Sequence, residues 1–161
     1  MTHPFWGEMN KIILFMSLLF SLGLNAGVDS AFEKASDDMR FDNAYQFYRL
    51  EQYDKALVLL QEYLEVYEDG SHRETAFDYL AGIYFMRYDY RKALKIYLAH
   101  FEEFSDTEEG VRAYYNAGIC YRKMGMKADA EKVFTTIISE YSAFQSASDA
   151  RMQLDVQNII K

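Results

Sequence analysis

The stretch Glu51-Gln-Tyr-Asp-Lys-Ala-Leu57 returns in altered form as Tyr88-Asp-Tyr-Arg-Lys-Ala-Leu94 and as Gly125-Met-Lys-Ala-Asp-Ala-Glu131. The alanines Ala56, Ala93 and Ala130 are 37 residues apart both times. A constant period in the range of about 20–50 residues is typical of solenoids and other repeat architectures. The sequence therefore predicts three copies of one structural unit.

Other positions recur with the same period around each alanine. A small residue stands twelve positions before it, an aromatic residue nine before it and a large apolar residue four after it. In that order the three sets are Ala44, Ala81 and Gly118; Phe47, Tyr84 and Tyr121; and Leu60, Tyr97 and Phe134. Small residues allow two helix backbones to approach closely, and a bulky partner side chain fills the adjoining hole. Each unit is thus predicted to be a pair of antiparallel helices.

The pattern predicts three first helices over about 38–50, 72–87 and 108–124, and three second helices over about 54–67, 91–104 and 127–141. Ser71, with Glu74 three positions later, matches a capping box, and Thr107 is expected to be an N-cap. A final amphipathic helix over about 145–160 would close the end of the stack with Met152, Val156, Ile159 and Ile160.

These units resemble the tetratricopeptide repeat family. The signature positions that match are Tyr114, Tyr115, Asn116, Gly118, Tyr121, Gly125, Ala130 and Phe134 in the third unit, Leu80, Ala81, Tyr84, Tyr90, Ala93 and Tyr97 in the second, and Ala44, Phe47, Tyr53 and Ala56 in the first. The resemblance implies an all-α, right-handed α–α superhelix of three helical hairpins plus a C-terminal capping helix. The expected domain covers residues 37–160, with repeats over about 37–70, 74–107 and 111–144, after a lead-in segment at 27–36.

The 37-residue period is longer than the usual 34 residues of this family. Units of this length are similar to those of exported bacterial envelope proteins, such as the periplasmic partner of the Tol–Pal system and the lipoprotein of the outer-membrane barrel assembly machine. No cysteine near the N-terminus offers a site for a lipid anchor, which argues against the lipoprotein.

In the family, the first helices of the units line a concave groove that binds protein segments. Carrying its positions over gives a predicted partner-binding groove made of Phe41, Tyr45, Tyr48, Phe85, Met86, Arg112, Tyr115, Asn116, Ile119 and Arg122. Arg112 and Asn116 are four apart on one helix face and could hold a carboxylate or a peptide backbone. Aromatic residues at Phe41, Tyr45 and Tyr79 replace the basic clamp with which some members bind chaperone tails. Ordinary packing between helices is the alternative role for each groove aromatic.

The N-terminal region predicts export. Residues 12–24 form an uncharged apolar run behind Lys11, which is typical of a secretory signal and too short for a spanning helix. Small residues allow cleavage after Ala26, so residues 1–26 are the predicted signal peptide, and Met9 would begin a better signal than Met1. An uncleaved anchor and a buried apolar helix are the alternatives.

Composition excludes several classes of function. The net charge is −8 and no run of Lys and Arg occurs, so nucleic acid is not an expected partner. The apolar share of 50% excludes a disordered chain. The single cysteine, Cys120, cannot form an intramolecular disulfide and is expected to be buried and inert.

No catalytic, cofactor or metal site is expected. His3, His72 and His100 lack ligand spacing, and no phosphate loop or nucleophile motif occurs. The resulting prediction is a non-catalytic scaffold of the bacterial cell envelope, periplasmic or envelope-associated, with a protein or peptide partner and no small-molecule substrate. The alternatives are a membrane-tethered assembly factor, with membrane contact only if the N-terminal segment is retained, and a cytoplasmic adaptor; the sequence leaves homo-oligomers open.

Overall fold

The computed structural model describes residues 29–159. A helix over 29–49 is followed by α2 (Tyr53–Val66), α3 (Arg73–Met86), α4 (Tyr90–Glu103), α5 (Glu108–Lys123), α6 (Lys127–Glu140) and α7 (Gln145–Ile159). These bounds follow the predicted ranges, except that residues 29–36, expected as a lead-in, are already helical. The expected signal peptide lies outside the described residues. Among the described helices, none is long and apolar enough to cross a membrane.

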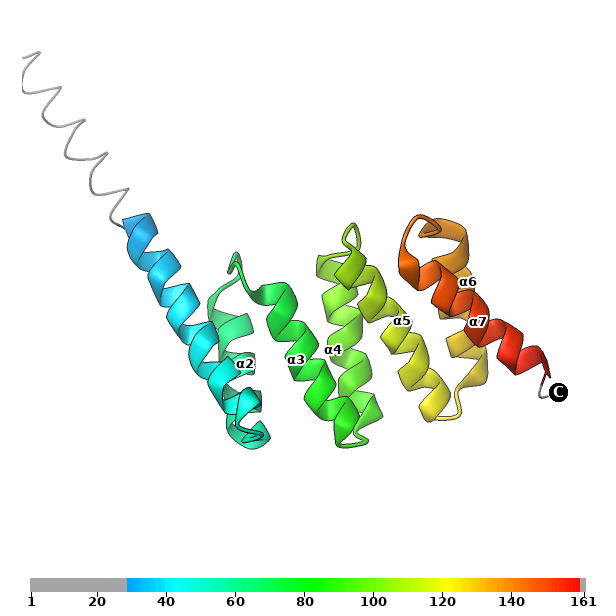
Figure 1. Cartoon of the computed structure of the whole chain (residues 1–161), viewed down its shortest axis with the longest axis horizontal. Helices are drawn as coiled ribbons and strands as arrows, with labels where there is room; N and C mark the ends of the chain where they lie inside the picture. Colours follow the sequence, from blue (N-terminus) through cyan, green and yellow to red (C-terminus); the bar gives the residue numbers. More distant parts are fainter. Residues whose placement is uncertain (1–28, 160–161) are drawn as a thin grey trace, which may run out of the picture.

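Consecutive helices pair into three antiparallel hairpins, and α7 packs beside the third (Figure 1). The turns inside the hairpins lie along one edge of the molecule, and the links between hairpins lie along the opposite edge. We call these the turn edge and the link edge. The architecture confirms the predicted all-α solenoid of three hairpins and one further helix.

The helices form two layers, with 29–49, α3, α5 and α7 in one and α2, α4 and α6 in the other (Figure 1). Helix α5 contacts both α3 and α7 within its layer, whereas the second helices have no comparable contacts with one another. Because the first helices are closer together, their layer forms the inner, concave side of the solenoid.

The predicted close crossings lie at the centres of the hairpins. Ala44, Ala56, Ala81, Ala93 and Ala130 are fully buried. Gly118 faces Phe134 so closely that an added Cβ would lie 2.6 Å from the phenyl ring. Phe134 thus fills the hole that the small residue leaves, as the repeat pattern predicts.

One of the two predicted helix caps is confirmed. The hydroxyl of Thr107 accepts a hydrogen bond from the amide of Gly110 (2.9 Å) and donates one to Glu74 (2.6 Å). The prediction for Ser71 is wrong, because α3 begins after His72 and has no side-chain cap. The amide and hydroxyl of Ser71 instead donate to Asp37 on the N-terminal helix, at 2.8 and 2.7 Å.

The C-terminal helix covers the stack with small residues. Ala147 and Ala150 are buried against the third hairpin, and Leu154 packs beside them. The prediction that Met152 and Val156 close the end is wrong, since they are 56% and 48% exposed. Their positions lie on another face of α7, and Ile160 is outside the described residues.

Both ends of the stack carry polar side chains where inner units have apolar or small ones. On α7, Asp155 stands 37 residues after Gly118, at the position of close crossing, and it is exposed. On the N-terminal helix, exposed Asn43 and Gln46 occupy the positions that Leu80 and Ile83 fill in the buried interface of α3. These residues make both end faces unsuited to another hairpin packed in the same way.

Candidate functional site

The concave layer brings the predicted groove residues onto three helices, and the 37-residue period adds α7 as a fourth. Met152 and Val156 occupy on α7 the positions of Tyr115 and Ile119 on α5. Ile119 is partly exposed, while Met152 and Val156 are among the most exposed apolar side chains of the described chain. The apolar strip therefore runs along α5 and α7.

The N-terminal end of the groove is a stack of aromatic rings. Tyr79 of α3 stacks on Tyr48 at 4.4 Å and on Tyr45 at 5.5 Å between ring centroids. Burial raises the pKa of both Tyr48 and Tyr79 above the ordinary value, so these phenols stay neutral. Phe41 is only 7% exposed and packs on His72 and Tyr63, so it offers a partner little surface.

In the middle of the groove, side chains that could contact a partner are mostly engaged within the protein already. Phe85 is half-buried and meets Tyr90 edge to face at 5.3 Å, while Met86 beside it is exposed. The guanidinium of Arg112 donates to Asp78 on α3, so its charge is already paired. Arg112 therefore links two hairpins as well as facing the groove.

Helices α5 and α7 are joined through one glutamine. Gln153 donates from Nε2 to the hydroxyl of Tyr115 (2.8 Å), and its Oε1 accepts from Arg122. Asn116 lies among these groups and is half-buried, but its amide has no hydrogen-bond partner among the described residues. The amide is not among the buried atoms that lack a hydrogen bond, so it reaches solvent and is open to a ligand.

A buried polar layer lies beneath the groove between the second and third hairpins. His100 is fully buried and stacks on Phe77, and neither ring nitrogen has a hydrogen bond. Its Nδ1 lies 3.4 Å from Asp78, and its Nε2 lies 3.9 Å from Glu74. The two carboxylates instead bind Arg112 and Thr107 of the next hairpin.

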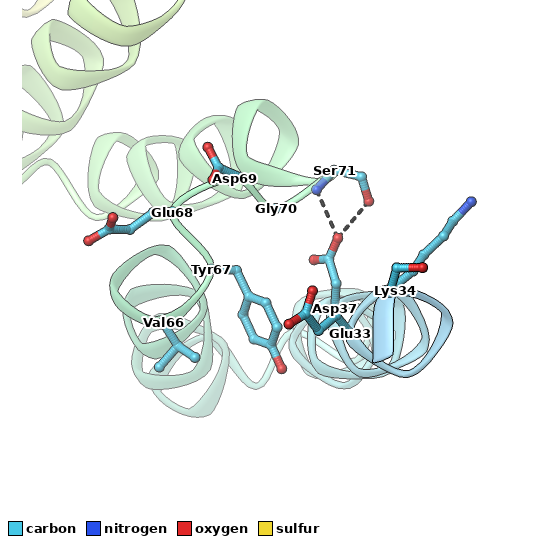
Figure 2. A pocket seen from close by; sticks show the side chains of 10 residues that line it. Glu33, Lys34, Asp37, Val66, Tyr67, Glu68, Asp69, Gly70 and Ser71 are labelled. Atoms are coloured by element: carbon cyan, nitrogen blue, oxygen red, sulfur yellow. Dashed lines mark hydrogen bonds between the residues drawn. The ribbon is translucent and has the colours of Figure 1, made fainter. Parts of the chain in front are cut away.

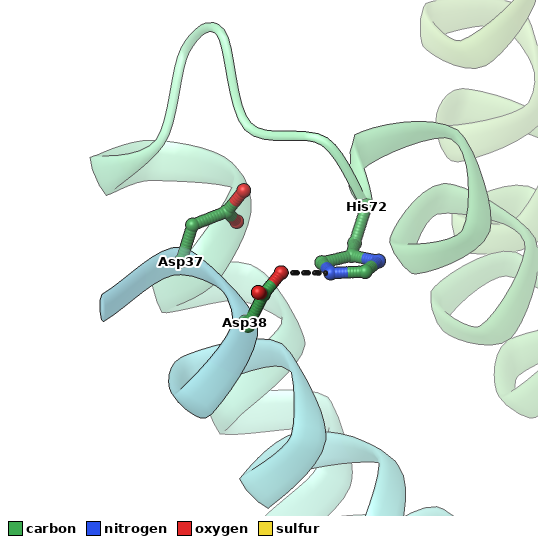
Figure 3. A group of neighbouring side chains, drawn as sticks. All are labelled: Asp37, Asp38 and His72. Carbon is green, nitrogen blue, oxygen red and sulfur yellow. Dashed lines mark hydrogen bonds and ion pairs between the residues drawn. The ribbon is translucent and has the colours of Figure 1, made fainter. Parts of the chain in front are cut away.

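A second polar cluster joins the N-terminal helix to the start of α3 (Figure 3). Ligand atoms of Asp37, Asp38 and His72 lie within 4.8 Å of one another, close enough to approach one cation. Each already has a protein partner, because Asp38 accepts from His72 at 2.8 Å and Asp37 binds Tyr63 and Ser71. The cluster serves to fix the first hairpin against the second.

A pocket of about 610 Å³ opens beside this cluster on the link edge (Figure 2). Its lining is mainly polar and carries four carboxylates and one ammonium group: Ser30, Glu33, Lys34, Asp37, Val66, Tyr67, Glu68, Asp69, Gly70 and Ser71. Ser71 donates to Asp37 here, but no histidine stands among these residues to activate its hydroxyl. The lining therefore holds no serine–histidine pair.

The match with a known protein family lies in the third hairpin. Residues 112–143 match a family model, from the first turn of α5 to the link after α6. The matching model is that of the tetratricopeptide repeat. No curated protein matches the chain. Tetratricopeptide repeats are protein–protein interaction modules and are typically non-catalytic, so this domain implies a scaffold that binds protein partners.

The position of α7 along the concave groove is what the sequence prediction missed. Asp149, Met152, Gln153 and Val156 stand 37 residues after Arg112, Tyr115, Asn116 and Ile119. The period alone would have placed them on the groove. The amphipathic pattern of 145–160 predicts a capping helix, but it does not distinguish an end face from an inner face.

Proposed function

We propose that this protein is a non-catalytic scaffold of the bacterial cell envelope that holds a segment of another protein in its concave groove. The observation that carries the proposal is the set of solvent-accessible apolar side chains Ile119, Met152 and Val156 on α5 and α7, together with the amide of Asn116, which has no hydrogen-bond partner among the described residues. Apolar side chains supply buried area on binding, and a free amide fixes the register of a peptide backbone.

The two halves of the groove differ in how much they offer a partner. In the N-terminal half, the ring faces of the tyrosines already stack on one another. The half formed by α5 and α7 leaves its apolar side chains exposed. An exposed apolar strip of this kind is typical of an interaction site, so we assign the main contact to α5 and α7.

The envelope location rests on the sequence of the N-terminal region. An apolar run at 12–24 behind Lys11, with small residues around Ala26, is typical of an exported chain. A retained segment would make the protein a membrane-tethered assembly factor, and a cytoplasmic adaptor would keep the whole chain in solution. The mass of the N-terminus of the protein isolated from cells separates the cleaved, exported form from both alternatives, because cleavage after Ala26 removes 26 residues. Partition between the membrane pellet and the soluble fraction then separates the two uncleaved forms.

Site-specific crosslinking tests the groove. A photoreactive residue replaces Ile119 or Val156 in the groove, or exposed Val58 on α2 as a control outside it. We expect one protein adduct from both groove positions and none from the control. Adding Asn116→Ala to the groove probes should weaken that adduct. Adducts formed equally from Val58 would place binding on another face, and the absence of any adduct at the groove would refute the proposal.

A further inference from the structure

Charge is divided between the two edges of the solenoid. The three segments of the turn edge, 48–56, 85–93 and 122–130, contain eight basic and four acidic residues, a net charge of +4. The three segments of the link edge, 65–75, 102–112 and 139–149, contain two basic and eleven acidic residues, a net charge of −9. Each turn segment has only two or three basic residues, so no basic run occurs in the sequence. The fold places the three segments along one edge of the molecule (Figure 1).

Large apolar side chains project from the same turns. Leu50 is 63% exposed, Tyr88 is 78% exposed and Met126 is 42% exposed, one in each hairpin turn. Basic residues flank them without an ion-pair partner among the described residues, notably Arg91, Lys123 and Lys127. The turn edge therefore repeats one combination three times, an apolar tip beside cationic side chains.

Tyr88 stands at the position where all three hairpin turns have a left-handed residue, the others being Glu51 and Gly125. Tyr88 has φ of 62°, in the left-handed region, and Gly125 has φ of 78° at the corresponding position of the third hairpin. A bulky residue with positive φ is strained where glycine is not. The ring is almost fully exposed apart from edge contact with Tyr90, so little packing offsets this strain.

We propose that the turn edge docks onto the surface of an anionic lipid bilayer. Arg91, Lys123 and Lys127 meet the headgroups, and the tips Leu50, Tyr88 and Met126 enter the interface between headgroups and acyl chains. Basic residues beside apolar ones are the combination that holds peripheral proteins on anionic membranes. The groove on α5 and α7 stays open to a partner in this orientation.

The overall negative charge does not prevent this docking. Helices α2, α3, α4 and α6 have 14 residues each, so the two edges are about 21 Å apart at a rise of about 1.5 Å per residue. The Debye length at physiological salt is about 8 Å. Screening over more than two such lengths weakens the repulsion from the link edge to roughly a tenth, while the basic turn edge acts at contact.

A bilayer fits this edge better than a nucleic acid or an acidic protein. The three turns that carry the tips lie along one edge of the molecule, as docking on an extended flat surface requires (Figure 1). Nucleic acid binding draws its affinity from phosphate contacts, to which the apolar tips Leu50, Tyr88 and Met126 contribute nothing, whereas a bilayer interface takes them up. The acidic link edge points away from the membrane in this orientation, which selects one way of docking.

Fluorescence quenching tests the orientation with the full chain. A dye is attached at Met126→Cys on the turn edge or, as a control, at Ser142→Cys on the link edge, while buried Cys120 stays unlabelled. The vesicles are phosphatidylcholine, alone or mixed with phosphatidylserine, with a nitroxide quencher on the lipid. We expect phosphatidylserine to increase quenching at 126 severalfold and to leave 142 unchanged. Equal quenching at both positions, or no effect of phosphatidylserine, would overturn the proposal.

Matched charge reversals distinguish binding through the turn edge from an effect of the protein's net charge. Arg91→Glu on the turn edge and Lys34→Glu near the link edge change the net charge equally. We expect Arg91→Glu to weaken the response of the dye at 126 on the order of tenfold and Lys34→Glu to leave it intact. An equal loss would show that net charge alone governs binding. The proposal of docking on a bilayer would also be refuted if the fluorescence of the dye at 126 changed with a homopolymeric RNA or an acidic peptide but not with phosphatidylserine.

Substitution of Tyr88 distinguishes a role of its side chain in membrane docking from a role in the stability of the fold. Tyr88→Gly relieves the positive φ, so the midpoint of urea unfolding should rise, while quenching at 126 in phosphatidylserine vesicles should fall severalfold. A structural role for the side chain would instead lower the unfolding midpoint. Quenching equal to that of the parent would show that the tip does not contact the membrane.

Discussion

The phenyl ring of Phe134 lies against the backbone of Gly118 in the third hairpin. An added Cβ at Gly118 would approach ring carbons of Phe134 to 2.6, 3.0 and 3.1 Å. Phe134 is fully buried, so the ring cannot swing into solvent to make room. The hairpin that matches the family model therefore depends on a missing side chain at this crossing.

Substituting Gly118→Ala should lower the free energy of unfolding by about 1–3 kcal/mol, because the added methyl group overpacks the crossing. Gly82→Ala on α3 is the matched control, since a Cβ there meets nothing within 4 Å. The control should stabilise by about 0.5–1 kcal/mol through helix propensity. Urea denaturation followed by circular dichroism measures both. Equal effects of the same sign would contradict the close crossing.

Substituting Asp37→Asn should destabilise the protein by about 1–3 kcal/mol at neutral pH, because the amide keeps only one acceptor oxygen and its NH2 group faces either the hydroxyl of Tyr63 or the donors of Ser71. Burial alone would raise the pKa of Asp37, but the hydrogen bonds from Tyr63 and Ser71 outweigh it and hold the pKa below its ordinary value.

The stabilising contribution of Asp37 is consequently present above the unfolded pKa of about 4 and is lost as the pH falls through the lower folded value. The stability difference between parent and Asp37→Asn should shrink below about pH 4 in urea titrations. Asp42→Asn, an exposed change on the same helix, is the control and should leave stability unchanged. A constant difference across the acidic range would show that the carboxylate charge is not what matters.

Substituting His100→Phe should raise the free energy of unfolding by about 1 kcal/mol, since it removes two buried nitrogens without hydrogen bonds and keeps the ring stacked on Phe77. The same change at His72 should destabilise the protein, because it deletes the hydrogen bond to Asp38. Thermal unfolding at pH 8 compares the two variants. A strong loss for His100→Phe would mean that the imidazole binds Glu74 or Asp78 more firmly than its distances indicate.

Cys120 should react with thiol reagents only after unfolding. The side chain is fully buried, and burial raises the pKa of its thiol to about 12, so thiolate is scarce at neutral pH. The rate of reaction with a disulfide reagent at pH 8 should rise on the order of a hundredfold or more when urea is added past the unfolding midpoint. Rapid labelling in the absence of urea would contradict the burial of α5.

The repeat period predicts most of the fold because its positions are set by local packing. Ala93 and Gly118 must be small wherever two helices of a hairpin cross, and that requirement repeats every 37 residues. Thr107 was predictable as a cap for the same reason, since its partner is only three residues away.

The errors involve contacts between residues distant in sequence. Ser71 has the sequence of an N-cap, but Asp37 from the preceding helix binds its amide and hydroxyl instead. The free state of Asn116 and the pairing of Arg112 with Asp78 also depend on a neighbouring hairpin. A pattern within one unit does not contain this information, so only part of the groove could be predicted.

Asp155 at the crossing position of α7 limits how such an array can lengthen. A further hairpin placed after α7 would have to set a second helix against a charged side chain where Gly118 and Ala81 offer none. A unit duplicated between the second and third hairpins would meet matching surfaces on both sides. We therefore expect an array of this kind to lengthen more readily by internal duplication than by extension at the tail, with the acidic residue kept in its last helix.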